Sequence, residues 1–180
     1  MQSKHLLTWL ILGGLLWLAT SCRIRDAAPE AGVMPTPVAL AQWAISAEAS
    51  SQFGFPDWSP NRVIGEPQVS ACVDDPRAWA SARGTGLEWL ELYYAEPVYA
   101  TEVRVYQTFG RGGMARVLVV DEDGLAHLVW EGDDTGPCPG VLAVSFPRTA
   151  FRVQRVRLEI DESRQGFWNQ IDAVALIGIK

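Results

Sequence analysis

Residues 166–180 read GFWNQIDAVALIGIK, and this stretch decides the fold. A flexible tail would be polar and poor in β-branched residues, whereas this segment is apolar up to its end. After Asp172 both faces of an extended chain are apolar, which is typical of a central strand covered on both sides. We therefore expect a buried β-strand that the rest of the fold closes around, with Trp168, Asn169 and Asp172 at its entrance.

Two of the residues at this entrance have predictable roles. Asp172 is expected to accept hydrogen bonds from loop amides or from an arginine, because an unpaired buried carboxylate is costly. Trp168 is expected to pack over the loop that it closes.

Period-2 alternation predicts further strands upstream, each with one apolar and one polar face. These segments are WAISAEAS (43–50), LEWLELYY (87–94), VYATEVRVYQTF (98–109), ARVLVV (115–120), AHLVW (126–130), VLAVSF (141–146) and FRVQRVRLEI (151–160). Residues 121–124, DEDG, predict a tight hairpin turn. The alternation changes phase near Gln154–Arg155, which predicts a β-bulge or a bend there. Only SPNRVIGE (59–66) resembles a helical turn, so the pattern indicates an all-β antiparallel sandwich or jelly roll.

Composition excludes several functions. The chain has 180 residues and a net charge of −6, which argues against nucleic-acid binding because that requires a basic face. It has two histidines, of which His5 lies in the apolar N-terminal segment; His127 is predicted to face solvent from a strand. This inventory is too small for a zinc site built on histidines or a serine–histidine–aspartate triad, so we expect no enzyme.

The N-terminal segment predicts an export signal. A basic start precedes an apolar stretch, Leu6–Leu18, and small residues lead to Cys22. This arrangement resembles the lipobox of bacterial lipoproteins, in which that cysteine is acylated, although Ala19 stands where the family has Leu. An uncleaved anchor or an ordinary signal peptide is the alternative. We expect a signal at 1–22, a proline-containing tether at 23–41, a globular domain at 42–180 and an extracytoplasmic, membrane-anchored location.

The order of the motifs within residues 42–180 resembles a discoidin-type (coagulation-factor C-type) domain of the galactose-binding-like superfamily. The matching stretches are WAISAEASSQF, RVIGEP, DDPRAWAS, LEWLELYYAEPVYATEVRVYQT and WNQIDAVALIG. The resemblance implies an eight-stranded jelly roll whose first and last strands lie close together. It also implies an attachment module that binds glycans, lipid head groups or proteins through loops at one end.

The resemblance also implies a structural calcium ion, held by an early acidic loop and a carboxylate near the last strand. Asp74 and Asp75 would supply the loop ligands, with Asp172 or Glu159 as the distant acid, since calcium prefers hard oxygen ligands. An Asx-turn before Pro76 explains the same two aspartates without a metal. The family pattern has an acid where Gln170 stands, which puts any role that needs this charge in doubt.

The predicted ligand-binding residues are the aromatic residues and arginines of the loops: Phe53, Phe55, Trp58, Arg83 and Arg111. Aromatic faces combined with a few polar groups are typical of sugar and head-group sites. Trp58 and Trp79, however, match positions that resemble core residues of the family. The sequence thus predicts a tethered module that recognises carbohydrate or cell-surface glycan; the alternative is a scaffold domain that docks an envelope protein and binds no sugar.

The cysteine count predicts a disulfide. The chain has three cysteines, and lipidation of Cys22 would leave Cys72 and Cys138 as a pair in an oxidising compartment. Both lie among turn residues, where buried free thiols would be unusual. We therefore expect a Cys72–Cys138 bridge, which requires Cα atoms at most about 7 Å apart.

Overall fold

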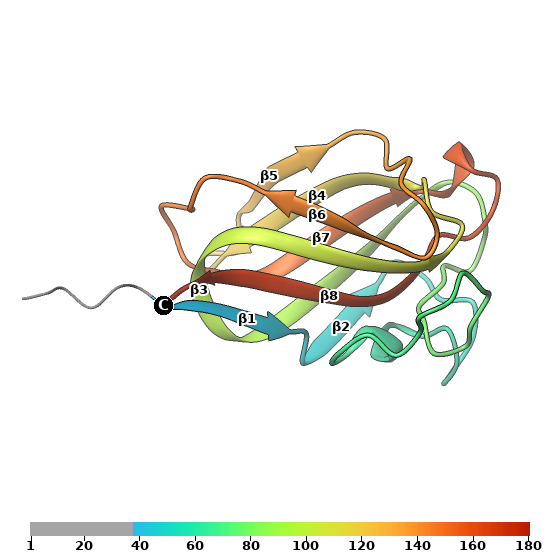
Figure 1. The fold of residues 1–180 in the computed structure, drawn as a ribbon, viewed down its shortest axis with the longest axis horizontal. Helices are drawn as coiled ribbons and strands as arrows, with labels where there is room; N and C mark the ends of the chain where they lie inside the picture. The colour runs from blue at the N-terminus through green and yellow to red at the C-terminus, as the bar shows by residue number, and fades with distance from the viewer. Residues whose placement is uncertain (1–37) are drawn as a thin grey trace, which may run out of the picture. The chain divides into compact units, whose positions relative to one another are not determined.

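The computed structural model describes residues 38–180, which form eight β-strands and two 3₁₀ turns (Figure 1). The elements are β1 (Ala39–Trp43), β2 (Ser46–Ala49), η1 (Pro60–Val63), β3 (Leu87–Phe109), β4 (Met114–Asp121), β5 (Ala126–Glu131), β6 (Gly140–Ser145), β7 (Val153–Asp161), η2 (Glu162–Arg164) and β8 (Gln170–Ile179). The predicted helical turn after Ser59 is present as η1. The predicted tether boundary is wrong by a few residues, because β1 begins at Ala39 rather than after residue 41.

The strands pair antiparallel in two layers that share β3. The first half of β3 pairs with β2 and β7, and β7 continues to β4 and β5. The second half of β3 pairs with β8 and β6, and β8 continues to β1. The sequence pattern predicts two strands separated by Pro97. The structure corrects this to one long strand whose register shifts between Tyr93 and Val98, where it passes from one sheet to the other.

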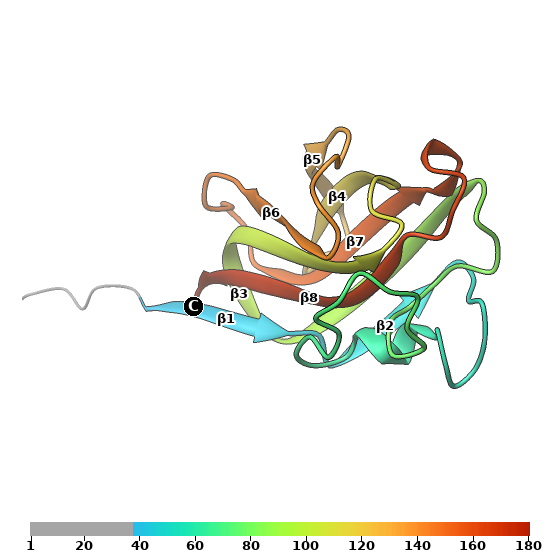
Figure 2. The same cartoon turned by 45° about the vertical axis from the view of Figure 1, so that its right-hand side comes forward.

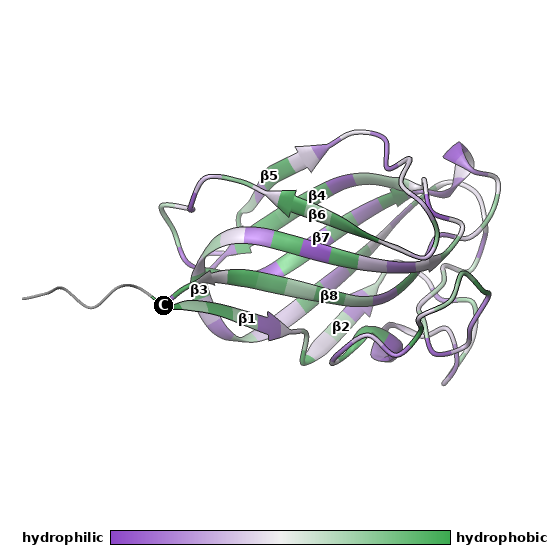
Figure 3. Cartoon of the chain, in the orientation of Figure 1, coloured by the Kyte–Doolittle hydropathy of each residue, from purple (hydrophilic) through white to green (hydrophobic). Residues whose placement is uncertain are grey.

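Strand β8 has the central position expected from its composition. It lies between β1 and β3, so both of its edges are hydrogen-bonded, and its residues from Gln170 to Leu176 are buried. Figure 3 shows the hydrophobic residues that continue along β8 after its polar start. The pairing of β1 with β8 also confirms that the first and last strands lie side by side.

Two local predictions are confirmed. Strands β4 and β5 form a hairpin, with the Asp121 carboxylate accepting hydrogen bonds from the Asp123 and Leu125 amides inside the turn. In β7 both Val153 and Val156 are buried, which requires an irregularity between them, and the register with β3 and β4 shifts at this point. The phase change in the sequence therefore corresponds to a β-bulge.

The core lies between the two layers. The first half of β3 contributes Leu90, Leu92 and Tyr94, the second half contributes Val103 and Val105, and all five are almost completely buried. Their partners across the core come from β7 and β8. The loops between β2 and β3, after β3, before β6 and between β7 and β8 gather at one end of the sandwich, opposite the start of β1 and the end of β8 (Figures 1 and 2).

The predicted signal, the lipid-modified Cys22 and most of the tether lie outside the described residues. Within residues 38–180 no helix has the length and apolar character needed to cross a bilayer.

Candidate functional site

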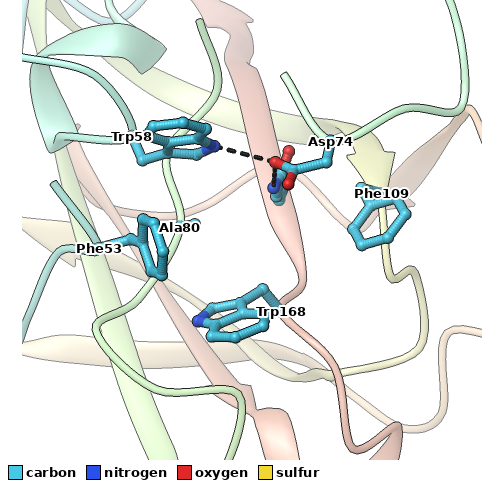
Figure 4. A pocket seen from close by; sticks show the side chains of 7 residues that line it. Phe53, Trp58, Asp74, Ala80, Phe109 and Trp168 are labelled. Carbon is cyan, nitrogen blue, oxygen red and sulfur yellow. Dashed lines mark hydrogen bonds between the residues drawn. The ribbon is translucent and has the colours of Figure 1, made fainter. Parts of the chain in front are cut away.

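An aromatic pocket opens at the loop end of the sandwich (Figure 4). Its volume is about 50 Å³, and its walls come from the loop after β2, the loop before β3, the end of β3 and the start of β8. The lining residues are Phe53, Trp58, Asp74, Ala80, Phe109, Trp168 and Gln170. Four of them carry aromatic rings, one carries a carboxylate and one an amide, which is the mixture found in binding sites for sugars and other small polar ligands.

Trp58 is held in a strained backbone conformation that aims its indole at this pocket. Its φ of 52° lies in the left-handed region, which is uncommon for a bulky residue. The conformation is fixed by two backbone hydrogen bonds: the Trp58 amide donates to the Pro76 carbonyl, and the Ala80 amide donates to the Trp58 carbonyl. The indole Nε1 then donates to Asp74 Oδ1 at 3.0 Å (Figure 4).

Asp74 is fixed from two sides. Besides the bond from Trp58, the Oδ1 atom accepts a hydrogen bond of 2.6 Å from Gln170 Nε2. The other amide atom of Gln170, Oε1, accepts a hydrogen bond from the Asp75 backbone at 3.1 Å. Gln170 is buried at the start of β8, so the amide that stands where the related pattern has an acid attaches the aspartate loop to the central strand.

Phe53 lies between the two tryptophans. Its ring centroid is 5.4 Å from that of Trp58 and 5.5 Å from that of Trp168, and both contacts are edge-to-face. Trp168 packs over this loop region, as expected from its position before β8. Gly110 allows the loop after β3 to approach the backbone of Trp168 closely. A Cβ at this position, where φ is +58°, would lie 1.9 Å from the Trp168 carbonyl oxygen.

Asp172 has the role that its buried position predicts. Its Oδ2 atom accepts hydrogen bonds from the backbone amides of Gln68 (2.8 Å) and Val69 (2.9 Å). Burial raises the pKa of Asp172 above its ordinary value, and these two amide donors partly oppose the increase. The carboxylate thus attaches the loop that leads to Asp74 onto β8.

The three aspartates predicted to bind calcium do not converge. Asp74 binds Trp58 and Gln170, whereas Asp172 binds the loop amides. Asp75 forms an ion pair with Arg77 at 2.7 Å and accepts from the Arg77 amide, and the hydrogen bonds from Arg77 lower its pKa. This is the Asx-turn alternative before Pro76. Within residues 38–180 no group of three metal-binding side chains is present, and Glu159 pairs with arginines of the sheet.

Only two of the five predicted ligand residues line the pocket. Phe53 and Trp58 line the pocket, and Phe53 keeps about half of its surface exposed. Phe55 is 75% exposed in the same loop, and Arg83 is exposed on the loop before β3, but neither belongs to the lining. The neighbouring Trp79, which matches a core position of the related family, is completely buried.

Arg111, predicted as a ligand-binding loop residue, does not line the pocket. Its side chain is only 7% exposed and forms an ion pair with buried Asp134 at 2.7 Å. The guanidinium also donates to the carbonyls of Pro137 and Val141. Burial alone would raise the pKa of Asp134, but the hydrogen bonds from Arg111 and Gln107 outweigh it and the pKa is lowered. Arg111 therefore organises the loop before β6.

The predicted Cys72–Cys138 disulfide is present, with the Cα atoms 5.2 Å apart. It joins the loop that carries Asp74 to the loop that Arg111 organises. His127 lies on β5, stacked on Phe151 at 3.9 Å and bonded to Asp121 at 2.8 Å, so it is partly covered rather than solvent-facing.

A second hollow of about 190 Å³ lies beside the disulfide. Its walls come from Val69, Tyr106, Gln107, Thr108, Pro139, Gly140 and Val141. Of these seven residues one carries an aromatic ring and none carries a charge, so the smaller pocket has the richer chemistry for a ligand.

A family model describes this chain from residue 36 to residue 180: Pappalysin-1, SD scarf domain, C-terminal. The chain belongs to this family. A search of curated proteins finds no match to this chain. The fold of the chain is the galactose-binding-like jelly roll that the discoidin resemblance implied.

Solved structures with the same fold include three modules. Chitosan-binding module 1 of a chitosanase/glucanase from Paenibacillus sp. IK-5 has 16% identity and a TM-score of 0.58, covering 73% of this chain and 92% of the module. The CBM32 of AlyQ, solved with 4,5-unsaturated mannuronic acid, has 18% identity and a TM-score of 0.57 (75% and 96% covered). The family 32 CBM of C. perfringens NanJ, solved with galactose, has 13% identity and a TM-score of 0.58 (77% and 99% covered).

Part of the scarf domain's pocket is not predicted from the sequence. Trp168 is predicted to pack over a loop and Asp74 to bind calcium, and no ligand contact is predicted for Phe109 or Gln170. Trp168 and Gln170 could have been recognised from their position at the start of the buried strand β8. Side chains at the start of a strand lie next to the loops at that end of the sandwich.

Proposed function

We propose that this scarf domain is a glycan-binding module that holds its ligand in the aromatic pocket without transforming it. The observation that carries the proposal is the pocket itself: Phe53, Trp58 and Trp168 surround a carboxylate and an amide at the loop end. Aromatic rings stack on the apolar faces of sugar rings, and the polar groups orient the hydroxyls. The solved modules named above support this reading, since chitosan, an unsaturated mannuronic acid and galactose are named as their ligands.

The test is a glycan array probed with the purified protein, followed by titration of the best ligand. Phe53→Ala and Trp168→Ala should each weaken binding about tenfold, because each removes a stacking face of the pocket. Leu125→Ala is the matched control, since Leu125 is 62% exposed in the β4–β5 turn. Equal loss of affinity in all three variants, or an array without a ligand, would contradict the proposal.

A protein-docking role is the second candidate, and one observation favours it. Phe53, Phe55 and Phe167 are more than half exposed on loops at the same end, and exposed apolar patches often mark protein contacts. Phe55→Ala and Phe167→Ala distinguish the two functions. They would abolish docking of a protein on this rim, whereas a glycan held in the pocket alone would bind both variants as well as the parent chain.

We further propose that the module is tethered to a membrane on its extracytoplasmic side through acylated Cys22. The fold suits such a tether, because β1 starts at the end of the sandwich opposite the pocket loops, so an anchored domain would present its pocket outward (Figures 1 and 2). Mass spectrometry of the membrane fraction should find a lipid on Cys22. A Cys22→Ser protein that still carried lipid would refute the anchor.

A further inference from the structure

The carboxylate in the pocket has no cationic partner among the described residues. Both hydrogen bonds to Asp74 Oδ1 come from neutral groups, the Trp58 indole and the Gln170 amide. The neighbouring Asp75, by contrast, is neutralised by Arg77 at 2.7 Å. Asp74 therefore presents its carboxylate from a fixed position without an ion-pair partner, and its Oδ2 atom accepts no hydrogen bond from residues 38–180.

The rings around Asp74 favour the same kind of ligand. The faces of aromatic rings attract cations, and the attraction is strongest for tryptophan. Phe53, Trp58 and Trp168 contribute such rings on one side, and Phe109 contributes another (Figure 4). Within the described part of the chain no basic side chain lines the pocket, so no cation would offset the repulsion between Asp74 and an anionic group.

The size of the pocket sets the size of the group that enters it. About 50 Å³ of accessible space admits a few water molecules, since roughly 10–15 Å³ on this measure admits one. A space of this size suits one substituent of a sugar ring, while the ring itself rests against Phe53, which keeps about half of its surface exposed.

We infer that the pocket selects the protonated amine of an amino sugar, with Asp74 as the residue that determines this specificity. The inference rests on the proposed glycan-binding function and deepens it. The fold alone does not decide the charge of the ligand, because modules with this fold are reported with chitosan, which carries amines, and with an unsaturated mannuronic acid, which carries a carboxylate. Asp74 determines the charge of the preferred ligand, because its carboxylate pairs with an amine and repels another carboxylate.

The experiment is calorimetric titration of the purified full chain with three oligosaccharides of equal length. These are oligomers of glucosamine, of N-acetylglucosamine and of a uronic acid. The glucosamine oligomer should bind about tenfold more tightly than the acetylated one, a difference of about 1.4 kcal/mol, because acetylation removes the charge that pairs with Asp74. Its affinity should fall as salt rises, whereas that of the acetylated oligomer should not.

Asp74→Asn is the matched variant. The side-chain oxygen of the substituted asparagine still accepts from Trp58 and Gln170, so the loop keeps its anchors and only the charge is lost. This variant should bind both oligomers equally. If it fails to fold, as judged by its melting temperature, the salt dependence of the parent chain still tests the inference.

Each remaining outcome has a separate meaning. Equal affinity of the parent chain for the amine and the acetamide, or tighter binding of the uronate, overturns the amine inference and leaves glycan binding intact. Binding of none of the three oligomers, together with an empty array, overturns glycan binding itself. A fourth titration uses a lysine-rich peptide. If the peptide binds more tightly than the glucosamine oligomer, the cation comes from a protein and the inference is overturned.

Discussion

Glu162 is completely buried between two segments that form the pocket. Its Oε2 atom accepts a hydrogen bond of 2.8 Å from the Asn169 amide, next to Trp168. Its Oε1 atom lies 2.8 Å from Ser81 Oγ, which also lies 2.8 Å from the Arg83 carbonyl oxygen. The serine hydroxyl has one hydrogen for two acceptors. A protonated Glu162 removes the conflict, because it donates to Ser81 while Ser81 donates to the carbonyl.

The environment agrees with this protonated state. Burial raises the pKa of Glu162 from 4.5 to about 7, and the charges of Glu88 and Asp161 add to the increase. The hydrogen bonds that Ser81 and Asn169 donate to the ionised form oppose it. A carboxyl group with a raised folded-state pKa stabilises the protein below its unfolded pKa and loses this contribution as pH rises through the folded pKa.

Glu162→Gln should therefore change how stability depends on pH. Glutamine mimics the neutral acid, donating to Ser81 and accepting from the Asn169 amide. Near pH 4.5 the variant and the parent should be equally stable. By pH 8 the variant should be more stable by about 3 kcal/mol, since each pKa unit corresponds to 1.36 kcal/mol. Denaturant titrations at both pH values measure this difference, and a constant difference across the range would contradict the assignment.

Single residues are predictable from sequence where a local rule fixes their environment. Asp172 enters an apolar strand, so its need for donors follows from burial, and the cysteine pair follows from counting. The prediction for Arg111 fails because GRGG looks like an exposed turn, whereas its partner Asp134 is 23 residues away and buried. The prediction for Asp74 fails because the sequence does not show that Trp58 and Gln170 point at it. Long-range pairing of this kind has no local signature.

At the scale of elements, the Cys72–Cys138 disulfide joins two loops that must keep a fixed conformation for the pocket to form. One carries Asp74, and the other precedes β6 and holds Asp134. Replacing both Cys72 and Cys138 by serine should lower the free energy of unfolding by roughly 4 kcal/mol, because the bridge closes a loop with a sequence separation of 66. Denaturant unfolding with and without reductant measures this. The parent should weaken on reduction and the double variant should not; equal stability of the two oxidised proteins would argue against the estimate.

Elements are predicted well where alternation is clean. Strand β8 is recognisable as central because both its faces are apolar, and the bulge in β7 is recognisable because the phase changes at Gln154. The continuity of β3 is not recognisable from the sequence, because Pro97 suggests a break between two strands. Pro97 lies where β3 passes from one sheet to the other and its register with β7 shifts. The proline therefore marks a bend within one strand and not the end of a strand.

At the scale of the whole molecule, the fold depends on β1 covering the last strand. The five residue pairs of β1 with β8 run from Ala39–Ile179 to Trp43–Ala175, and they give β8 its second hydrogen-bonded edge. Without them an apolar strand would become an exposed edge, which invites pairing with other chains. The family match begins at residue 36, before this strand, which agrees with the structural boundary and not with the predicted one at 42.

The two boundaries make different predictions for isolated fragments. A fragment of residues 36–180 should melt at the temperature of the full chain, because it retains all of β1. A fragment of residues 42–180 loses Ala39–Ala41 and their pairs with Ile177–Ile179, together with the packing of Leu40 against the core. Its melting temperature should fall by roughly 5–10 °C, corresponding to a loss of about 2–3 kcal/mol. It should also sediment as larger species at high concentration, because the end of β8 is uncovered. Calorimetry and sedimentation velocity on both fragments measure these effects, and identical melting and sedimentation would show that β1 does not contribute to the stability of the sandwich.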